Sequence, residues 1–122
     1  MQGRRGKVNE QAHILITGRD PDLLETRSLV LQTAGHRVST TLEPIATFAP
    51  LESVQLLIVC HTLEASERQS DLEALGIASP NARALCVAPY SGDMGDIATF
   101  NSYEGPREMM RVVNRLLCAG AN

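Results

Sequence analysis

The strongest constraint on how this chain folds is the apolar run LLIVC, residues Leu56 to Cys60, which ends at a thiol followed by His61. A strand that is apolar at consecutive positions is covered on both faces, as happens in the middle of a parallel sheet. Parallel strands need long crossover connections, which are usually helices. The run therefore predicts an α/β domain, and it raises the question whether the thiol and the imidazole at its end carry out chemistry.

Strand-like and helix-like segments alternate along the chain. Strands are expected at 12–17, 37–41, 54–60, 82–88 and 97–102, and helices at 21–35, 66–76 and from 106 onward. Between 44 and 50 there is room for only one or two helical turns, with Ile45 and Phe48 pointing inward. Asp20 can cap the first long helix, and Gly35 and Gly76 stand where helices commonly end. The last helix has a clear amphipathic face.

Five parallel strands joined by right-handed crossovers leave few topologies. The expected fold is a three-layer α/β sandwich with helices on both faces of a five-stranded sheet of order 2-1-3-4-5. The stretch 89–96 is Gly-rich, so the fourth helix is expected to be short or absent. The 122 residues fit one domain, expected at 12–118, with a flexible arm at 1–11 and a tail at 119–122.

Charge and cysteine usage narrow the classes of function. A net charge of −3 gives no electrostatic case for nucleic acid binding. No apolar run approaches the roughly 20 residues that span a bilayer, so no membrane partner is expected. The three cysteines, Cys60, Cys86 and Cys118, have no CxxC spacing. They indicate isolated thiols in a reducing, cytoplasmic compartment and neither a disulfide framework nor a zinc site.

In a sheet of this order, ligands and chemistry gather beyond the carboxyl ends of the strands, near the first and third strands. The loops there begin at Gly18-Arg19-Asp20 and at Cys60-His61. Neighbours on a strand point to opposite sides, so adjacency alone makes no hydrogen bond between Cys60 and His61. A catalytic thiol also needs a lowered pKa, which a nearby cation such as Arg19 could supply. Arg19 could instead pair with Asp20 or Glu64, and a solvated loop residue is the favoured interpretation. An inert buried thiol is the favoured interpretation.

At this point the chain resembles a response-regulator receiver (CheY-like) domain with the flavodoxin-like (βα)5 fold. The resemblance covers about residues 12–118 and rests on ILITGRD for the first strand and its loop, LLIVC for the third strand, and GPREMMRVVNRLL for the last helix. Receivers carry a phosphoacceptor Asp after strand 3, an acidic pair after strand 1 that binds magnesium, a Ser or Thr after strand 4 and a Lys after strand 5.

Carried onto this sequence, the resemblance finds almost none of these residues. The phosphoacceptor position falls on Cys60, and the acidic pair falls on Gly18 and Arg19, with Asp20 one place late. The hydroxyl position falls on Ala88 and the lysine position on about Ser102. Lys7, in the arm, is the only lysine of the chain.

The missing groups are those that phosphoryl transfer requires. A divalent ion held by oxygen ligands must neutralise the phosphate charge, and a thiol does not replace a carboxylate that forms an acyl phosphate. The resemblance therefore implies a degenerate receiver that cannot be phosphorylated. We expect no metal, no cofactor and no catalytic residue, and a protein that is not an enzyme. It would act by protein–protein interaction in a bacterial-type signalling or regulatory pathway.

The resemblance also places the interaction surface on strand 5 and the last helix. Phe100 lies near the aromatic position that moves in switching receivers. Tyr103, Arg107, Arg111 and Arg115 complete the expected surface, and the arginines recur every four residues on one side of a helix. This face could bind an acidic protein partner or form a homodimer. A solvated helix face is the other meaning of such a stripe.

Other functions stay open. A thiol-based redox sensor or small cysteine-dependent enzyme would use an accessible Cys60 with a lowered pKa. A flavodoxin-like ligand-binding module would bind nucleotide or flavin. A conventional phosphorelay receiver would need Asp20 and Asp22 in the pocket and another phosphate acceptor.

Overall fold

The computed structural model describes residues 12–48, 51–60, 62–88, 98–101 and 104–120. In chain order its elements are β1 (His13–Thr17), α2 (Pro21–Thr33), β2 (Arg37–Thr41), η1 (Ile45–Thr47), η2 (Leu51–Ser53), β3 (Leu56–Val59), α3 (Ala65–Ala78), β4 (Arg83–Ala88), β5 (Ala98–Asn101) and α4 (Pro106–Gly120). Within the described residues, none of the helices combines the length and the apolar character needed to cross a membrane.

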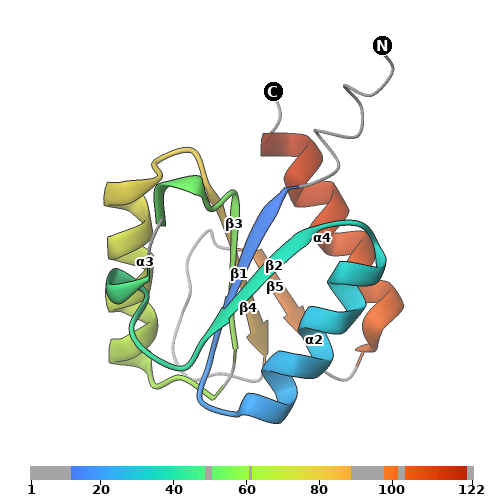
Figure 1. Ribbon diagram of the computed structural model, residues 1–122, viewed down its shortest axis with the longest axis horizontal. Helices are drawn as coiled ribbons and strands as arrows, with labels where there is room; N and C mark the ends of the chain where they lie inside the picture. The colour runs from blue at the N-terminus through green and yellow to red at the C-terminus, as the bar shows by residue number, and fades with distance from the viewer. Residues whose placement is uncertain (1–11, 49–50, 61, 89–97, 102–103, 121–122) are drawn as a thin grey trace.

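The five strands form one parallel sheet of order β2-β1-β3-β4-β5, which confirms the predicted order. The register is continuous, with Ile14 beside Val38 on β2 and beside Leu56 on β3. Figure 1 looks at the sheet from the side of β2, which crosses in front of the other strands. All four strand pairs are parallel, so the carboxyl ends of the strands meet at one edge.

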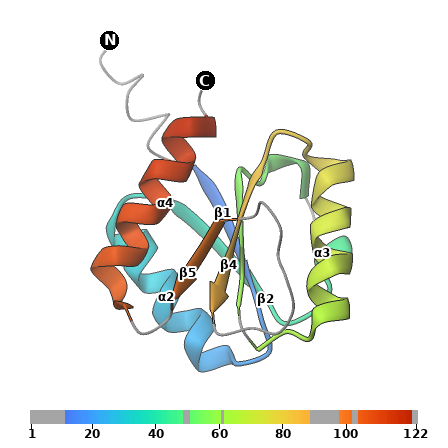
Figure 2. The same ribbon diagram turned by 180° about the vertical axis from the view of Figure 1, so that it is seen from behind.

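Helices cover both faces of the sheet, so the chain has the predicted flavodoxin-like three-layer fold (Figures 1 and 2). On one face, α2 and α4 cover an aliphatic cluster around Ile14, Ile16, Ile58 and Leu85. On the other face, η1, η2 and α3 cover a second cluster that contains residues such as Leu15, Leu57 and Cys86. β3 contributes to both clusters, which explains why LLIV is apolar at every position.

Local signals set the ends of α2. The Asp20 side chain accepts hydrogen bonds from the backbone N–H groups of Asp22 and Leu23, at 3.0 and 3.4 Å, and Pro21 fills the first helical position. After the helix, Gly35 adopts φ of 96°, a conformation that a residue without a β-carbon adopts most easily. Both bounds follow the prediction to within two residues.

The bounds of α3 and β3 differ from the prediction by one or two residues. α3 begins at Ala65, not Ser66, because Glu64 caps it in a reciprocal pair with Glu67, and it continues through Gly76 to Ala78. One glycine costs a helix interior only about 1 kcal/mol, so Gly76 does not end it. β3 begins at Leu56, two residues later than expected.

The end of the last helix and the segment between β4 and β5 can also be compared with the prediction. α4 runs to Gly120, beyond the domain end expected at residue 118. The described residues contain three α-helices, which fits a short or absent fourth helix. The segment 89–97, where that helix would fall, lies outside the described residues.

Candidate functional site

The loops predicted to form the site do meet at the carboxyl edge of the sheet. Gly18 follows β1 and Cys60 follows β3, and the two strands are hydrogen-bonded neighbours. The Cys60 N–H donates to the Thr17 carbonyl at 2.9 Å, and the Gly18 N–H donates to the Thr41 carbonyl at 3.4 Å. The fold thus brings Gly18 and Cys60 side by side, the positions onto which the resemblance maps part of the acidic pair and the acceptor.

Gly18 is packed so closely that a β-carbon at this position would require its neighbours to shift by a few tenths of an ångström. A β-carbon there would lie 3.0 Å from Cys60 Cβ, 3.0 Å from Thr62 Oγ1 and 3.4 Å from Leu24 Cδ2. Its φ is not positive, so the backbone alone would accept other residues. Close contact with these neighbours, and not the backbone conformation, is therefore what disfavours a side chain at this position.

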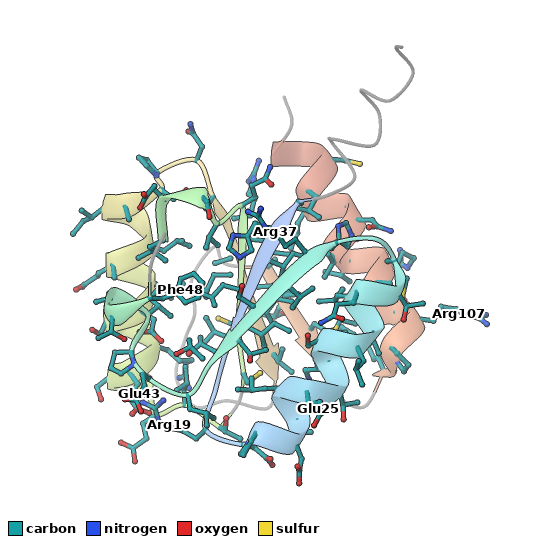
Figure 3. All side chains as sticks on the ribbon, viewed as in Figure 1. Arg19, Glu25, Arg37, Glu43, Phe48 and Arg107 are labelled. Atoms are coloured by element: carbon teal, nitrogen blue, oxygen red, sulfur yellow. The ribbon has the colours of Figure 1, made fainter. Side chains whose placement is uncertain are left out.

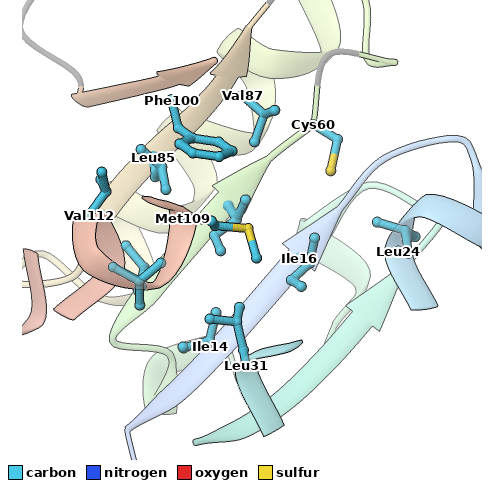
Figure 4. Close-up of a cluster of buried hydrophobic side chains, with 13 residues drawn as sticks. Ile14, Ile16, Leu24, Leu31, Cys60, Leu85, Val87, Phe100, Met109 and Val112 are labelled. Carbon is cyan, nitrogen blue, oxygen red and sulfur yellow. The ribbon is translucent and has the colours of Figure 1, made fainter. Parts of the chain in front are cut away.

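Cys60 is buried and receives a hydrogen bond from a buried arginine of α2. Arg27 Nη1 lies 2.9 Å from Cys60 Sγ, and the two residues are only 9% and 1% exposed. Burial raises the pKa of the Cys60 thiol, while the Arg27 charge opposes that rise. Figure 4 shows the thiol among apolar side chains, with Leu24 and Ile16 nearby. The thiol is therefore protonated and shielded at neutral pH.

Arg19 connects three segments at this edge. Its guanidinium donates to the Leu42 carbonyl, which follows β2, and forms an ion pair with Glu67 of α3. Its backbone N–H donates to Thr62 Oγ1 at 2.8 Å. We expected either a solvated side chain or a pair with Asp20 or Glu64, so the observed partner corrects the prediction.

Two carboxylates near this edge, those of Asp20 and Glu67, accept hydrogen bonds from other groups of the protein. The Asp20 carboxylate caps α2, as described above. Glu67 accepts from the Glu64 N–H at 3.0 Å as well as from Arg19, and these two hydrogen bonds lower the pKa of Glu67. In the described part of the chain, no three His, Cys, Asp or Glu side chains gather as a metal site would require.

The structure describes only some of the other predicted positions. Ala88 ends β4, where its backbone pairs with Asn101 of β5. Phe100 is 4% exposed and packs into the core on the α4 side of the sheet. It therefore does not contribute to an exposed surface, contrary to the prediction. His61, Ser102 and Tyr103 lie outside the described residues.

The predicted arginine stripe lies on the outer side of α4. Arg107, Arg111 and Arg115 are all exposed, whereas Met109 and Val113 on the same helix are buried. Figure 3 shows Arg107 extending away from the protein. Arg111 is bound to Glu108 through two hydrogen bonds, one of them 3.0 Å long from Nε.

Sequence reasoning missed three buried charged side chains, Arg27, Arg68 and Asp71. The burial of Arg27 could have been predicted from its spacing, because it stands three residues after Leu24 and four before Leu31. At this helical spacing it shares their buried face. Arg68 and Asp71 face the sheet from α3, where Arg68 Nη1 donates to the Leu63 carbonyl at 3.0 Å. Asp71 accepts from the Ile45 N–H at 3.1 Å, and burial raises its pKa.

A second polar cluster lies at the opposite edge of the sheet, around His13 at the start of β1. Its Nδ1 is 2.8 Å from Ser53 Oγ, and its Nε2 is 2.9 Å from Ser39 Oγ. Burial lowers the pKa of His13, and the charge of Arg37 adds to this effect. The imidazole is therefore neutral and structural at pH 7.

Comparison with known proteins places the fold among receiver domains. No protein-family model matches the chain, and no curated protein matches it in sequence. A CheY-like response regulator receiver domain protein from Methanospirillum hungatei has a TM-score of 0.77 and 19% identity over 91% of this chain and 97% of its own. The chemotaxis protein CheY4 of Vibrio cholerae has a TM-score of 0.74 and 14% identity over 87% and 98% of the two chains.

A third similar structure is a protein of Burkholderia pseudomallei described as pilus assembly-related. Its TM-score is 0.72, with 18% identity over 90% of this chain and 92% of its own. All these identities are so low that they establish the fold alone. The chain thus has a receiver-like fold whose carboxyl edge carries Gly18, Arg19, Arg27 and Cys60.

Proposed function

We propose that this protein is a receiver-like domain that cannot be phosphorylated and that acts through protein–protein contact in a signalling or regulatory pathway. The observation that carries the proposal is which residues stand where the receiver resemblance would place the groups that bind magnesium and phosphate. Cys60 and Arg27 form a buried pair there, and even a β-carbon at Gly18 would press against Cys60 and Thr62. Acyl-phosphate formation needs a nucleophilic carboxylate and a bound divalent ion; in the described part of this site a thiol stands at the acceptor position, and no group of side chains suited to a metal is found.

The same geometry argues against the thiol-dependent alternatives. A reactive cysteine is accessible and has a lowered pKa. Cys60 is 1% exposed, and burial raises its pKa. In the proposed function Cys60 is therefore not a catalytic residue and the protein is not an enzyme. The cytoplasmic location inferred from its isolated cysteines stays a prediction.

We place the partner surface on β5 and the outer side of α4. Arg107 and Arg115 are exposed, and in the described residues neither forms an ion pair. Such a stripe suits an acidic protein partner. Reversing both charges, as Arg107→Glu and Arg115→Glu, should abolish binding of that partner, whereas Arg83→Glu on β4 should not.

Two of the similar structures widen the range of pathways to consider. The proteins from Burkholderia pseudomallei and Burkholderia thailandensis are described as pilus assembly-related and pilus assembly proteins. The proposed contact function therefore includes assembly pathways beside signalling pathways.

The test is the intact mass of the protein after incubation with acetyl phosphate and magnesium, beside a phosphorylatable receiver treated in parallel. We expect the mass to stay unchanged. The Cys60→Asp variant should also stay unchanged, because the acidic pair remains absent. A gain of one phosphoryl group that hydroxylamine removes would establish an acyl phosphate and return the protein to the conventional phosphorelay class.

A further inference from the structure

Arg27 is a buried cation whose charge is not balanced by its neighbours. The side chain belongs to α2 and is 9% exposed, and its Nη1 donates to Cys60 Sγ at 2.9 Å. Within the described residues this is the one hydrogen bond of the guanidinium, and no carboxylate forms an ion pair with it. Burying an ion costs free energy unless an opposite charge or good acceptors compensate it. Arg27 therefore needs an acceptor that the described part of the chain does not supply.

The one acceptor that Arg27 has is a neutral thiol. Burial raises the pKa of Cys60, and although the Arg27 charge opposes that rise, the sulfur stays protonated at neutral pH. A thiol sulfur is a weak acceptor and carries no charge. The other buried arginine, Arg68, differs in this respect, because its Nη1 donates to the Leu63 carbonyl at 3.0 Å.

The part of the Arg27 guanidinium without a partner remains in contact with solvent. Its Nε and Nη2 make no hydrogen bond to the described residues. Neither nitrogen is among the fully buried side-chain atoms that lack a partner. Both nitrogens therefore reach the surface, although most of the side chain is buried. A small ligand could meet them without displacing the core.

The position of Arg27 in the fold also suits a ligand. Cys60 directly follows β3 and Gly18 follows β1, so the guanidinium lies at the carboxyl edge where the strand order reverses and where ligands bind in such sheets. Asp20 is the acidic residue to consider here, because its charge contributes to the raised pKa of Cys60. Its Oδ1 accepts from two N–H groups that begin α2, and it forms no ion pair with Arg27. Asp20 therefore offsets the Arg27 charge only in part.

We propose that Arg27 binds a small oxyanion at this edge of the sheet, without a covalent bond. With Nη1 on the Cys60 thiol, Nε and Nη2 remain as two parallel donors. Such a pair matches two oxygens of one phosphate or carboxylate group, which is the shared chemistry of the ligand. Arg27 is none of the positions onto which the receiver resemblance maps a functional residue. The site is thus a property of this chain, and it goes beyond the proposed contact function.

Side-chain ¹H–¹⁵N NMR of the whole chain tests the site directly. The Nε–H resonances of the arginines are followed during titration with inorganic phosphate and, separately, with acetate, while sodium chloride holds the ionic strength constant. We expect the Arg27 resonance to shift and to saturate at millimolar concentrations, because Asp20 offsets part of the charge. The resonance of Arg83, an exposed arginine that begins β4, should show no saturating shift. Saturation with phosphate alone assigns the ligand to phosphate groups, and saturation with acetate admits carboxylates.

Substitutions at Cys60 give the matched comparison, since they leave Arg27 in place. Cys60→Asp supplies a carboxylate from within the chain, which would occupy the guanidinium. Anion binding should then weaken by about tenfold or more, because the charge of Arg27 is already paired. Cys60→Ser introduces a neutral side chain of similar size and should keep the binding. Arg27→Lys keeps the charge but loses the paired donors, so it should bind more weakly than wild type.

Thermal melting provides a second readout. A ligand that binds only the folded state raises the melting temperature as its concentration increases. Phosphate also stabilises folded proteins in general, because it is excluded from their surface. The Arg27→Met variant measures that general part. The wild type and Cys60→Ser should show an additional, saturating increase that is absent from Arg27→Met and Cys60→Asp.

Three results would overturn the inference. The first is an Arg27 resonance that does not respond to either anion. The second is a Cys60→Asp variant that binds as tightly as wild type, and the third is an equal rise in melting temperature for wild type and Arg27→Met. Circular dichroism establishes that each variant is folded, and if Arg27→Met is not, the two Cys60 variants decide. A bound anion adds nothing to the intact mass of the denatured chain, so failure here leaves the proposed contact function to its own test.

Discussion

Replacing Gly18 with alanine would test whether this position is closed to any side chain. The added β-carbon would lie 3.0 Å from both Cys60 Cβ and Thr62 Oγ1. Truncating Cys60 to alanine would not relieve the first contact, because Cβ remains. Thr62 is held by the Arg19 N–H at 2.8 Å, so the second contact is also hard to relax.

The expected loss of stability follows from two opposing effects. Overfilling a packed site costs about 1–3 kcal/mol. Removing a glycine from the unfolded chain returns about 0.4–1 kcal/mol, since the backbone at Gly18 needs no positive φ. The free energy of unfolding should therefore fall by about 1–2 kcal/mol. For a chain of this size the melting temperature should drop by roughly 3–10 °C.

Gly76→Ala is the matched control. Gly76 lies within α3, and a β-carbon there would meet nothing within 4 Å. This variant should gain about 0.5–1 kcal/mol, because alanine favours the helix. Urea denaturation followed by circular dichroism measures both variants. If Gly18→Ala is as stable as wild type, or gains stability as Gly76→Ala should, then close packing does not disfavour a side chain at position 18, and this explanation is refuted.

Three further predictions concern buried polar groups. Cys60→Asp should be tolerated beside Arg27, but in an Arg27→Met background it should lower the free energy of unfolding by about 3–5 kcal/mol more, because the carboxylate would then be buried without a partner. Urea denaturation of the wild type, the two single variants and the double variant measures this coupling, and additive effects would contradict it. One of the three thiols, that of exposed Cys118, should react with a disulfide reagent in the folded chain at neutral pH, and all three should react after denaturation. A fast reaction that persists in Cys118→Ser would show an accessible core thiol. Burial lowers the pKa of His13 in the folded state, so just below the ordinary pKa of about 6.5 the unfolded state binds more protons than the folded state. The free energy of unfolding should therefore fall as the pH drops below that value. His13→Gln should reduce this dependence in melts between pH 7.5 and 5, and an unchanged slope would assign it to other groups.

The sheet could be predicted from the sequence because its strands are continuous apolar runs. Every position of LLIV packs into one of the two cores, which is what an uninterrupted apolar strand between two helical layers requires. The edge strand RVSTT was recognisable by its polarity, and its bounds were predicted correctly. The handedness of the crossovers left few strand orders, and the flavodoxin-like order chosen among them is the one observed.

The interior of the site could not be predicted, because it depends on long side chains that reach across elements. Arg27 and Cys60 are 33 positions apart, and their contact exists only once α2 lies on the sheet. Arg27 was not predicted to lie on the buried face of its helix, and arginine is seldom fully buried. Arg19 was expected to be solvated or to pair with Asp20 or Glu64, whereas its partner is Glu67, three residues beyond Glu64 on α3.

Glu67 uses both of its carboxylate oxygens: one accepts from the Glu64 N–H at the start of α3, and the other accepts from Arg19. The loop after β1, the chain after β2 and the first turn of α3 are therefore held in one arrangement before any partner arrives. A protein that binds at this edge would meet a surface that is already ordered, so little conformational entropy is lost in forming the complex. Its association should follow a single bimolecular phase whose rate rises linearly with concentration, without the plateau that a preceding loop rearrangement would impose.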